Sequence, residues 1–178
     1  MIKTKAELKQ CLKTEKKSYV KTSWFLSLIG LSESSIIWRY QKFLRKWEYH
    51  YNSNHKCRTL FYKMKATSIG IKYGFHISPN NFDIGLYIVH IGSILINKNT
   101  RVGKNCRIHI NTALVATSGK ENGPIIGDNC YIGVGASIIG GIVLRDNITI
   151  GAGAVVTKSF EESSITLGGV PAKIISRQ

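Results

Sequence analysis

His90 is the residue whose type and setting point most directly to chemistry. It lies in the stretch GLYIVHIGSILIN, residues 85–97, where it is the one side chain that can gain or lose a proton near neutral pH. An unperturbed imidazole has a pKa of about 6.5, so it can take the proton of a hydroxyl during a reaction. The alternative is a histidine held in a core by hydrogen bonds.

The residues after Gly74 follow a six-residue repeat. Aliphatic side chains stand at every sixth position, and small or aliphatic residues stand four positions later. A helix would repeat about every 3.6 residues and a simple strand about every two, whereas a hexapeptide period is typical of a parallel β-helix with three short faces per turn. The repeat predicts this fold for residues 73–178. Its inward positions are Ile96, Val102, Ile108, Leu114, Ile126, Ile132, Ile138, Leu144, Ile150 and Val156.

Two interruptions of the repeat predict irregular segments. Lys120 takes an inward position inside the polar stretch ATSGKENGP, which predicts a loop pushed out of the coil near residues 115–124. The other interruption lies between Ile88 and Ile96, where the chain holds about two residues more than the repeat requires. Such irregularities redirect side chains. We therefore expect His90 to point away from the core.

Residues 1–72 carry a helical pattern instead. Thr4 and Glu7 form a capping box ahead of a lysine-rich helix, and Ser32 precedes a longer helical run. A third helical piece is expected over Cys57–Lys65. In the longer run, apolar residues recur every three or four positions: Ile36, Ile37, Tyr40, Phe43, Leu44 and Trp47.

The ends of a stacked coil need covers, because a terminal turn cannot bury its apolar face alone. The N-terminal helices are expected to cover one end. The C-terminal tail, residues 159–178, is expected to cover the other end or to run back along a face.

The formal net charge of +15 is concentrated near the N-terminus. Residues 1–72 hold sixteen basic and four acidic side chains. Such a segment fits an anionic membrane surface, an acidic polymer or nucleic acid, and the alternative is a helical face that lysines only solvate. Trp24, Trp38 and Trp47 among the lysines are compatible with peripheral contact with an anionic membrane surface. No nucleic acid is expected, because the segment lacks the signature of a nucleic-acid-binding fold.

The four cysteines, Cys11, Cys57, Cys106 and Cys130, show neither CxxC spacing nor a zinc-type Cys/His pattern, so no metal is expected. With no recognisable signal peptide, the chain is expected to be cytoplasmic with reduced thiols, and a membrane-associated form is compatible with its basic segment. The apolar run Trp24 to Leu31 is too short to span a bilayer.

Five stretches of the repeat region resemble the left-handed β-helix acyltransferases with hexapeptide repeats: GLYIVHIGSILIN, VGKNCRIHINT, IIGDNCYIGVGASIIGG, IVLRDNITIGAGAVVTKS and GGVPAKII. They are most similar to serine acetyltransferases and their relatives that O-acetylate surface polysaccharides. The resemblance covers about Gly74 to Ile175. It implies an all-β left-handed parallel β-helix preceded by an N-terminal α-helical segment, a homotrimer with active sites between neighbouring coils, and acetyl-CoA as co-substrate.

The resemblance also implies roles for particular residues. It makes His90 the base that takes the acceptor's proton, and Asp83, one turn back in the coil, is the candidate that orients it. His109 follows an inward position, so we expect it to face outward, where it is either a surface histidine without function or, with Asn111, part of the substrate groove. The residues expected to bind CoA are Val134, Gly135, Ala152, Gly153, Lys158, Lys173 and Arg177, and the alternative is that the glycines only form corners and the cations are solvated.

The charges of a serine pocket are missing. The aspartates that this family places before its histidine read Phe75 and Val89, and the Arg-His pair before the loop proline reads Asn122 and Gly123. A free amino acid carries two charges that need partners, whereas a sugar hydroxyl carries none.

The sequence therefore favours an acetyl-CoA-dependent O-acetyltransferase acting on a sugar hydroxyl, with a glycan acceptor in surface or capsular polysaccharide biosynthesis. The alternative in the same reaction class is a serine O-acetyltransferase of cysteine biosynthesis. The alternative of another class is a non-catalytic trimeric β-helix scaffold with a basic binding segment.

Overall fold

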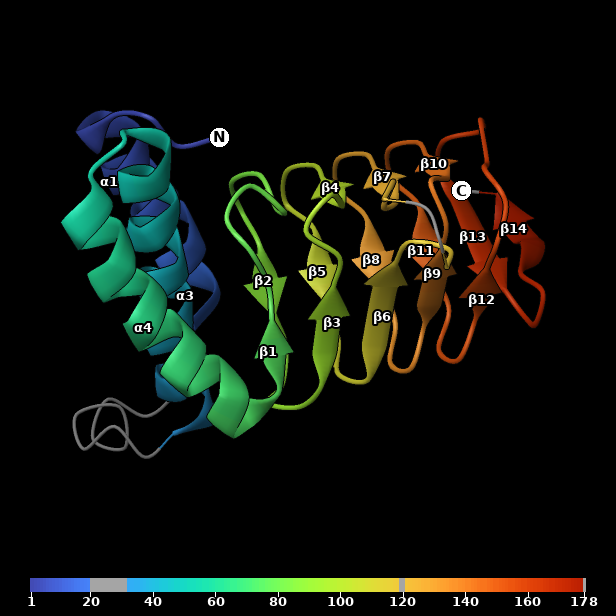
Figure 1. The fold of residues 1–178 in the computed structure, drawn as a ribbon. Coiled ribbons are helices and arrows are strands. Elements are labelled where there is room, and N and C mark those ends of the chain that lie inside the picture. The colour runs from blue at the N-terminus through green and yellow to red at the C-terminus, as the bar shows by residue number, and fades with distance from the viewer. Residues whose placement is uncertain (20–31, 119–120, 178) are drawn as a thin grey trace.

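The computed structural model describes residues 1–19, 32–118 and 121–177. Helices come first in the chain: α1 (Lys5–Lys16), the short 3-10 helix η1 (Lys17–Tyr19), α3 (Glu33–Asn52) and α4 (Lys56–Tyr73). Thr4 and Glu7 form the predicted capping box, and Ser32 caps α3. Figure 1 shows these helices gathered at one end of a coil of short strands.

The strands form three sheets, one on each face of the coil, which confirms the predicted parallel β-helix behind a helical segment. The first sheet contains β1 (Phe75–His76), β3 (Ile94–Ile96), β6 (Thr112–Val115), β9 (Ser137–Ile139) and β12 (Val155–Val156). The second contains β4 (Arg101–Val102), β7 (Ile125–Ile126) and β10 (Val143–Leu144). The third contains β2 (Tyr87–Ile88), β5 (Arg107–Ile108), β8 (Tyr131–Ile132), β11 (Thr149–Ile150), β13 (Ile165–Gly168) and β14 (Lys173–Arg177).

The core of the coil is built from the hexapeptide repeat. All ten predicted inward positions are buried, and so are the residues four positions after Ile126, Ile132, Ile138, Leu144 and Ile150, namely Cys130, Ala136, Ile142, Ile148 and Ala154. In the regular part, Ile132 pairs with Ile150, eighteen residues further on. Three hexads therefore make one turn, as the repeat predicts.

Both predicted irregularities are present. Ile88 pairs with Ile108, twenty residues on, whereas Ile94 pairs with Thr112, eighteen residues on, so two extra residues lie between Ile88 and Ile94. The loop between Val115 and Ile125 lengthens another turn, and Lys120 within it lies outside the described residues.

Helix α4 is longer than the predicted piece at Cys57–Lys65. It continues to Tyr73 and ends at Gly74, which takes a left-handed conformation with φ of 86°. Its second half contains residues with weak helix propensity, but Ala66 and Gly70 are buried where the helix packs on the rest of the protein. A Cβ at Gly70 would lie 2.5 Å from the Phe75 carbonyl oxygen, so this packing requires glycine. Tertiary packing therefore extends the helix to the start of the coil.

The C-terminal tail takes part in the coil to a greater extent than the sequence predicts. Phe160 forms a parallel bridge with Leu144, and β13 completes a further turn in the third sheet with Ile165 and Leu167 buried. Strand β14 then pairs antiparallel with β13 and covers that edge of the sheet. Only β14 behaves as the predicted cover.

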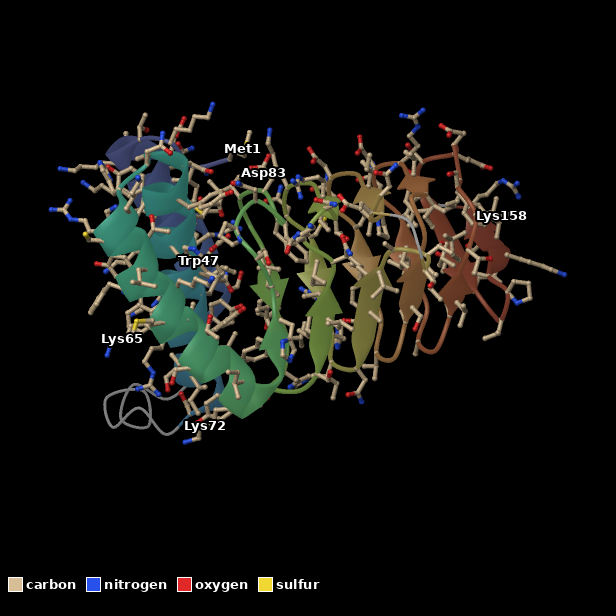
Figure 2. All side chains as sticks on the ribbon, in the orientation of Figure 1. Met1, Trp47, Lys65, Lys72, Asp83 and Lys158 are labelled. Atoms are coloured by element: carbon tan, nitrogen blue, oxygen red, sulfur yellow. The ribbon has the colours of Figure 1, made fainter. Side chains whose placement is uncertain are left out.

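Of the tryptophans considered for membrane contact, Trp38 and Trp47 are half-buried and pack against the core. Figure 2 shows Trp47 among the helices. Trp24 and the run to Leu31 lie outside the described residues. Within the described ranges, no helix is both long and apolar enough to cross a membrane.

The helical end of the coil is held by a buried polar network that the apolar stripe did not predict. Of the stripe on α3, Ile37, Tyr40 and Leu44 are buried, while the other three residues are half-buried. Gln41 and Arg45 are buried on the same helix. These polar residues face the first turn of the coil.

Arg45 joins three parts of the chain. Its guanidinium donates to Glu15 of α1 and to Glu48 of α3, with a shortest distance of 2.7 Å to each carboxylate. It also donates to the carbonyl oxygens of Phe82 and Asp83, both at 2.7 Å. A buried ion pair is stable only when its remaining donors and acceptors are satisfied, and here the partners satisfy the guanidinium on every side.

The same network satisfies the free backbone edge of β2, which has no strand on its outer side. Glu15 accepts from the N–H groups of Gly85 and Leu86, both at 3.2 Å. Gln41 donates to the Leu86 carbonyl at 2.8 Å, and the Tyr19 hydroxyl accepts from Ile88 N–H at 3.0 Å. Side chains of the helices thus replace a neighbouring strand.

We predict that Arg45→Ala lowers the free energy of unfolding by about 3–5 kcal/mol, because Glu15 and Glu48 would be left buried without a counter-charge. Denaturant unfolding at fixed protein concentration measures the change. Arg39→Ala, at an exposed position of the same helix, is the control and should change stability by less than about 0.5 kcal/mol. Equal stability of the two variants would contradict the structural role given to Arg45.

Candidate active site

Most of the residues that the sequence selected lie along one corner of the coil. We call it the histidine corner; it is the edge at which the chain passes from the third sheet to the first, at residues 89–93, 109–111, 133–136 and 151–154. Successive turns are joined there by backbone hydrogen bonds, from Gly135 N–H to the Ile110 carbonyl at 3.0 Å and from Gly153 N–H to the Val134 carbonyl at 2.8 Å.

His90 lies in the first turn of this corner and points outward, as the sequence predicted. Its side chain is 54% exposed, and Nδ1 lies 3.3 Å from Oε2 of Glu33. The other oxygen of Glu33 accepts from the backbone N–H of Ile91 at 2.6 Å. One carboxylate therefore binds both the imidazole and the backbone beside it.

The position of Glu33 follows from local structure. It is the first residue of α3, where a negative charge interacts favourably with the helix dipole, and Ser32 caps the same end by accepting from Ser35 N–H at 3.2 Å. The two-residue insertion makes the backbone of Ile91 available to this carboxylate. Helix α3 is held to the coil by Arg45, so the packing of the helix positions Glu33.

Asp83, the carboxylate expected beside His90, has other partners. It accepts from Ile84 N–H at 2.9 Å and lies 3.8 Å from the N-terminal amine of Met1. Figure 2 shows Asp83 next to Met1. Asp83 precedes β2 whereas His90 follows it, so the strand separates the two side chains. The structure thus brings Glu33 to His90 instead, a residue that sequence reasoning missed.

His109 lies beside His90, outside the coil. The two ring centroids are 6.1 Å apart, and the His109 ring also contacts Tyr131 at 5.1 Å. Burial, followed by the positive charges of His90 and Arg107, lowers the pKa of His109. The lowered pKa favours the neutral form of the ring. Its Nδ1 is buried and has no hydrogen-bond partner among the described residues, which favours the tautomer with the proton on Nε2.

The corner continues past the histidines as an open surface. Asn111, Gly135 and Gly153 all take left-handed φ angles, of 59°, 72° and 66° respectively. No atom lies within 4 Å of a Cβ built on Gly153, so the backbone there can be approached by a ligand. Val134 is 41% exposed. These residues make a surface on which an extended ligand can lie across successive turns.

The three cations predicted to bind CoA phosphates are not placed alike. The ammonium of Lys158 lies 5.4 Å from the centre of the Phe160 ring, past β12 and away from the histidine corner. Arg177 is 2.7 Å from Glu162 in an exposed ion pair. Lys173 follows Ala172, whose N–H donates to the Val155 carbonyl at 2.8 Å. Of the three, Lys173 is the one that directly follows residues 169–172, which leave β13 at the edge of the third sheet.

Asn122 and Gly123 lie at a different corner of the same chain. They belong to the loop between β6 of the first sheet and β7 of the second, and a Cβ on Gly123 would contact Thr100 at 2.5 Å. Within one chain, the coil therefore separates this loop from His90. Among the described residues, no group of three or more His, Cys, Asp or Glu side chains is placed to hold a metal ion.

Comparisons with known proteins agree with the fold. Residues 124–158 match the family model described as the hexapeptide repeat of succinyl-transferase. The chain is 38% identical over 95 residues to a serine acetyltransferase of Staphylococcus xylosus, which covers 52% of this chain and 43% of that protein. It is 34% identical over 96 residues to a serine acetyltransferase of Synechococcus elongatus, covering 52% of this chain and 38% of that protein. The chain thus spans less than half the length of these curated relatives.

The similarity of fold extends over nearly the whole chain. The crystal structure of a serine acetyltransferase from Neisseria gonorrhoeae matches with a TM-score of 0.73 and 25% identity, over 98% of this chain and 68% of that one. A serine acetyltransferase from Brucella abortus matches with a TM-score of 0.75 and 23% identity, over 97% and 70%. The predicted left-handed β-helix and the resemblance to hexapeptide-repeat acyltransferases are confirmed.

The pairing of His90 with Glu33 predicts a fixed tautomer. In the neutral ring, Nδ1 should carry the proton and donate to Glu33, and Nε2 should keep its lone pair. Nitrogen NMR of labelled histidine should show this form in the native protein and a loss of it in Glu33→Ala. Asp83→Ala is the control and should leave the His90 signals unchanged. A His90 ring that carries its proton on Nε2 in the native protein would contradict the pairing.

Proposed function

We propose that this chain is an acetyl-CoA-dependent O-acetyltransferase and that His90 is its general base. The observation that carries the proposal is the pairing of an exposed histidine with a carboxylate, at the start of an open corner that can take an extended co-substrate. The relatives named serine acetyltransferase support the reaction class.

In the proposed reaction, one side chain, His90, takes the proton of the acceptor and later gives it to the leaving group. Glu33 holds the proton of His90 on Nδ1, so Nε2 takes the proton of the acceptor hydroxyl as its oxygen attacks the thioester carbonyl carbon. The carbon–sulfur bond then breaks, and the imidazolium returns the proton to the sulfur of CoA. The carboxylate of Glu33 stabilises the imidazolium while it exists. The lowered pKa of His109 disfavours a second positive charge beside the imidazolium of His90.

Residues of the histidine corner are proposed to bind acetyl-CoA. The backbone at Val134, Gly135, Ala152 and Gly153 would contact the pantetheine chain, because side chains there are short and all but the half-buried Gly135 are exposed. Lys173 is the cation best placed for the phosphates. Lys158 and Arg177 would meet them only after leaving Phe160 and Glu162.

L-serine is the acceptor that the relatives favour, and the structure removes part of the argument against it. Glu33 supplies a carboxylate beside the base that the sequence alone did not reveal, and it can meet an ammonium group. Arg107, whose guanidinium lies 5.1 Å from the centre of the Tyr87 ring and contributes positive charge at His109, can meet a carboxylate. A free amino acid would then find a partner for each charge.

A sugar hydroxyl is the second candidate acceptor, and Phe75 and Val89 favour it. Phe75 is buried, with its ring centroid 4.8 Å from that of Tyr40, so this position belongs to the core and offers no charge to an amino acid. Asn122 and Gly123 add none in the loop. A sugar in a polysaccharide precursor would need only hydrogen bonds.

A homotrimer is proposed as the active form. One chain leaves the histidine corner open to solvent, and the loop with Asn122 lies at another corner, so this loop could line a site only in a neighbouring copy. The trimer would place each active site between two coils.

We predict that His90→Ala reduces acetyl transfer by on the order of 10²–10⁴-fold, because the acceptor hydroxyl loses its base. Release of CoA from acetyl-CoA measures the rate, and circular dichroism checks that the coil is intact. His76→Ala, at an exposed position of the first sheet, is the matched control and should keep native turnover. Normal turnover by His90→Ala would remove His90 from the mechanism, and native protein that neither binds nor turns over acetyl-CoA would favour a non-catalytic scaffold.

The acceptor is tested by release of CoA with L-serine and with a panel of sugars. Turnover with L-serine, lowered more than tenfold by Arg107→Gln through a higher KM, is the expected result if Arg107 meets the carboxylate. Lys104→Gln is the control at a nearby exposed cation. Turnover of sugars without turnover of L-serine would overturn the amino-acid assignment and support the second candidate.

A further inference from the structure

Helix α4 presents a row of apolar side chains to solvent. Leu60, Phe61, Met64 and Ile71 are 60%, 52%, 62% and 72% exposed. Their spacing of one, three and seven residues places them on one face of the helix. The opposite face, with Ala66 and Gly70, is the one buried against the rest of the protein. The helix therefore has an apolar face that the fold does not cover.

Such a row is uncommon on a helix at the surface of a soluble protein. Single exposed apolar residues are ordinary, but a contiguous apolar patch marks an interaction surface. The row extends over more than two helical turns, with the exposed polar residues Thr67 and Ser68 between Met64 and Ile71. No described segment lies over it, since its side chains remain exposed.

Cations border the row on both sides. By helical geometry, Arg58, Lys65 and Lys72 lie along one side and Lys56 and Lys63 along the other. Helix α4 contains no acidic residue. Figure 2 shows Lys65 and Lys72 projecting from the helix. Across the exposed face of α4, the apolar row therefore lies between two lines of positively charged side chains.

A basic cavity lies at the N-terminal end of the row. It has a volume of about 600 Å³ and is lined in part by Phe61, the three cations Lys5, Lys46 and Arg58, and His50. No carboxylate lines it. An anionic group of the size of a phosphate finds complementary charge there, directly beside an exposed aromatic ring.

We propose that this face of α4 docks on the surface of a bilayer that contains anionic phospholipids. The apolar row enters the boundary between head groups and acyl chains, and the bordering cations and the basic cavity meet lipid phosphates. Charge selects this occupant over a second α4 face, because two such faces would bring cations together without any carboxylate between them. The docking is peripheral and needs no helix that spans the membrane.

Flotation of the intact protein with vesicles tests the proposal without any need for turnover, so it is independent of the proposed reaction. The protein should float with vesicles of phosphatidylcholine and phosphatidylglycerol at about 7:3, and binding should fall steeply with salt. It should not float with phosphatidylcholine alone. Equal binding to both kinds of vesicle, or to neither, would overturn the proposal.

Two pairs of variants assign the contact to α4. Lys63→Gln with Lys65→Gln should weaken partitioning roughly 25-fold, about fivefold for each lysine, while the control Lys104→Gln with Lys158→Gln on the coil should change it little. Leu60→Ser with Met64→Ser should abolish binding, while Val170→Ser with Ile175→Ser, equally exposed at the other end of the coil, should not. Native binding by the α4 variants would contradict the proposal. A lower mass of the Leu60/Met64 variant by light scattering without vesicles would also contradict it, because the row would then be covered by a second copy.

Discussion

The backbone edge of the first coil turn is the constraint on which the rest of the structure depends. A parallel β-helix cannot end without leaving a row of N–H and C=O groups unpaired, and buried groups of this kind are costly. Here Glu15, Gln41 and Tyr19 pair with the outer edge of β2, and Arg45 holds the carboxylate of Glu15 in place. The helices are consequently fixed to the coil in one arrangement by directional bonds as well as by apolar packing.

This arrangement links the helices that cover the coil to the candidate active site at His90. The helix that contributes Gln41 and Arg45 begins at Glu33, whose carboxylate reaches the backbone of Ile91 and the ring of His90. The candidate base therefore belongs to the coil, and its carboxylate partner belongs to the helical segment. This division of roles gives His90 an anionic partner although Phe75 and Val89 carry no charge. The sequence shows that Glu33 lies in the first turn of a helix, but only the fold shows that its carboxylate lies beside His90.

The features that could be predicted from sequence are those that depend on a repeat of residue types over a short stretch of the chain. Inward residues at every sixth position predict the register of the coil. The two-residue insertion before Ile94 predicts that His90 points outward. The partner of His90, the buried polar network and the full length of α4 could not be read in this way, because each depends on residues far apart in sequence. The apolar stripe of α3 indicated a buried face but not that Arg45 would lie within it. The three cations predicted to bind CoA phosphates do not lie together, because Arg177 forms an ion pair with Glu162 and Lys158 lies over the Phe160 ring.

The central claim is that Glu33 acts through His90, and a double-mutant cycle tests it most directly. Single-turnover acetyl transfer would be measured for the native protein, Glu33→Gln, His90→Ala and the double variant, with folding checked for each. If Glu33 acts only by holding the imidazole, Glu33→Gln should slow transfer in the native background and should cause no further loss once His90 is alanine. The same fold-loss in both backgrounds would contradict the claim, because Glu33 would then act independently of His90.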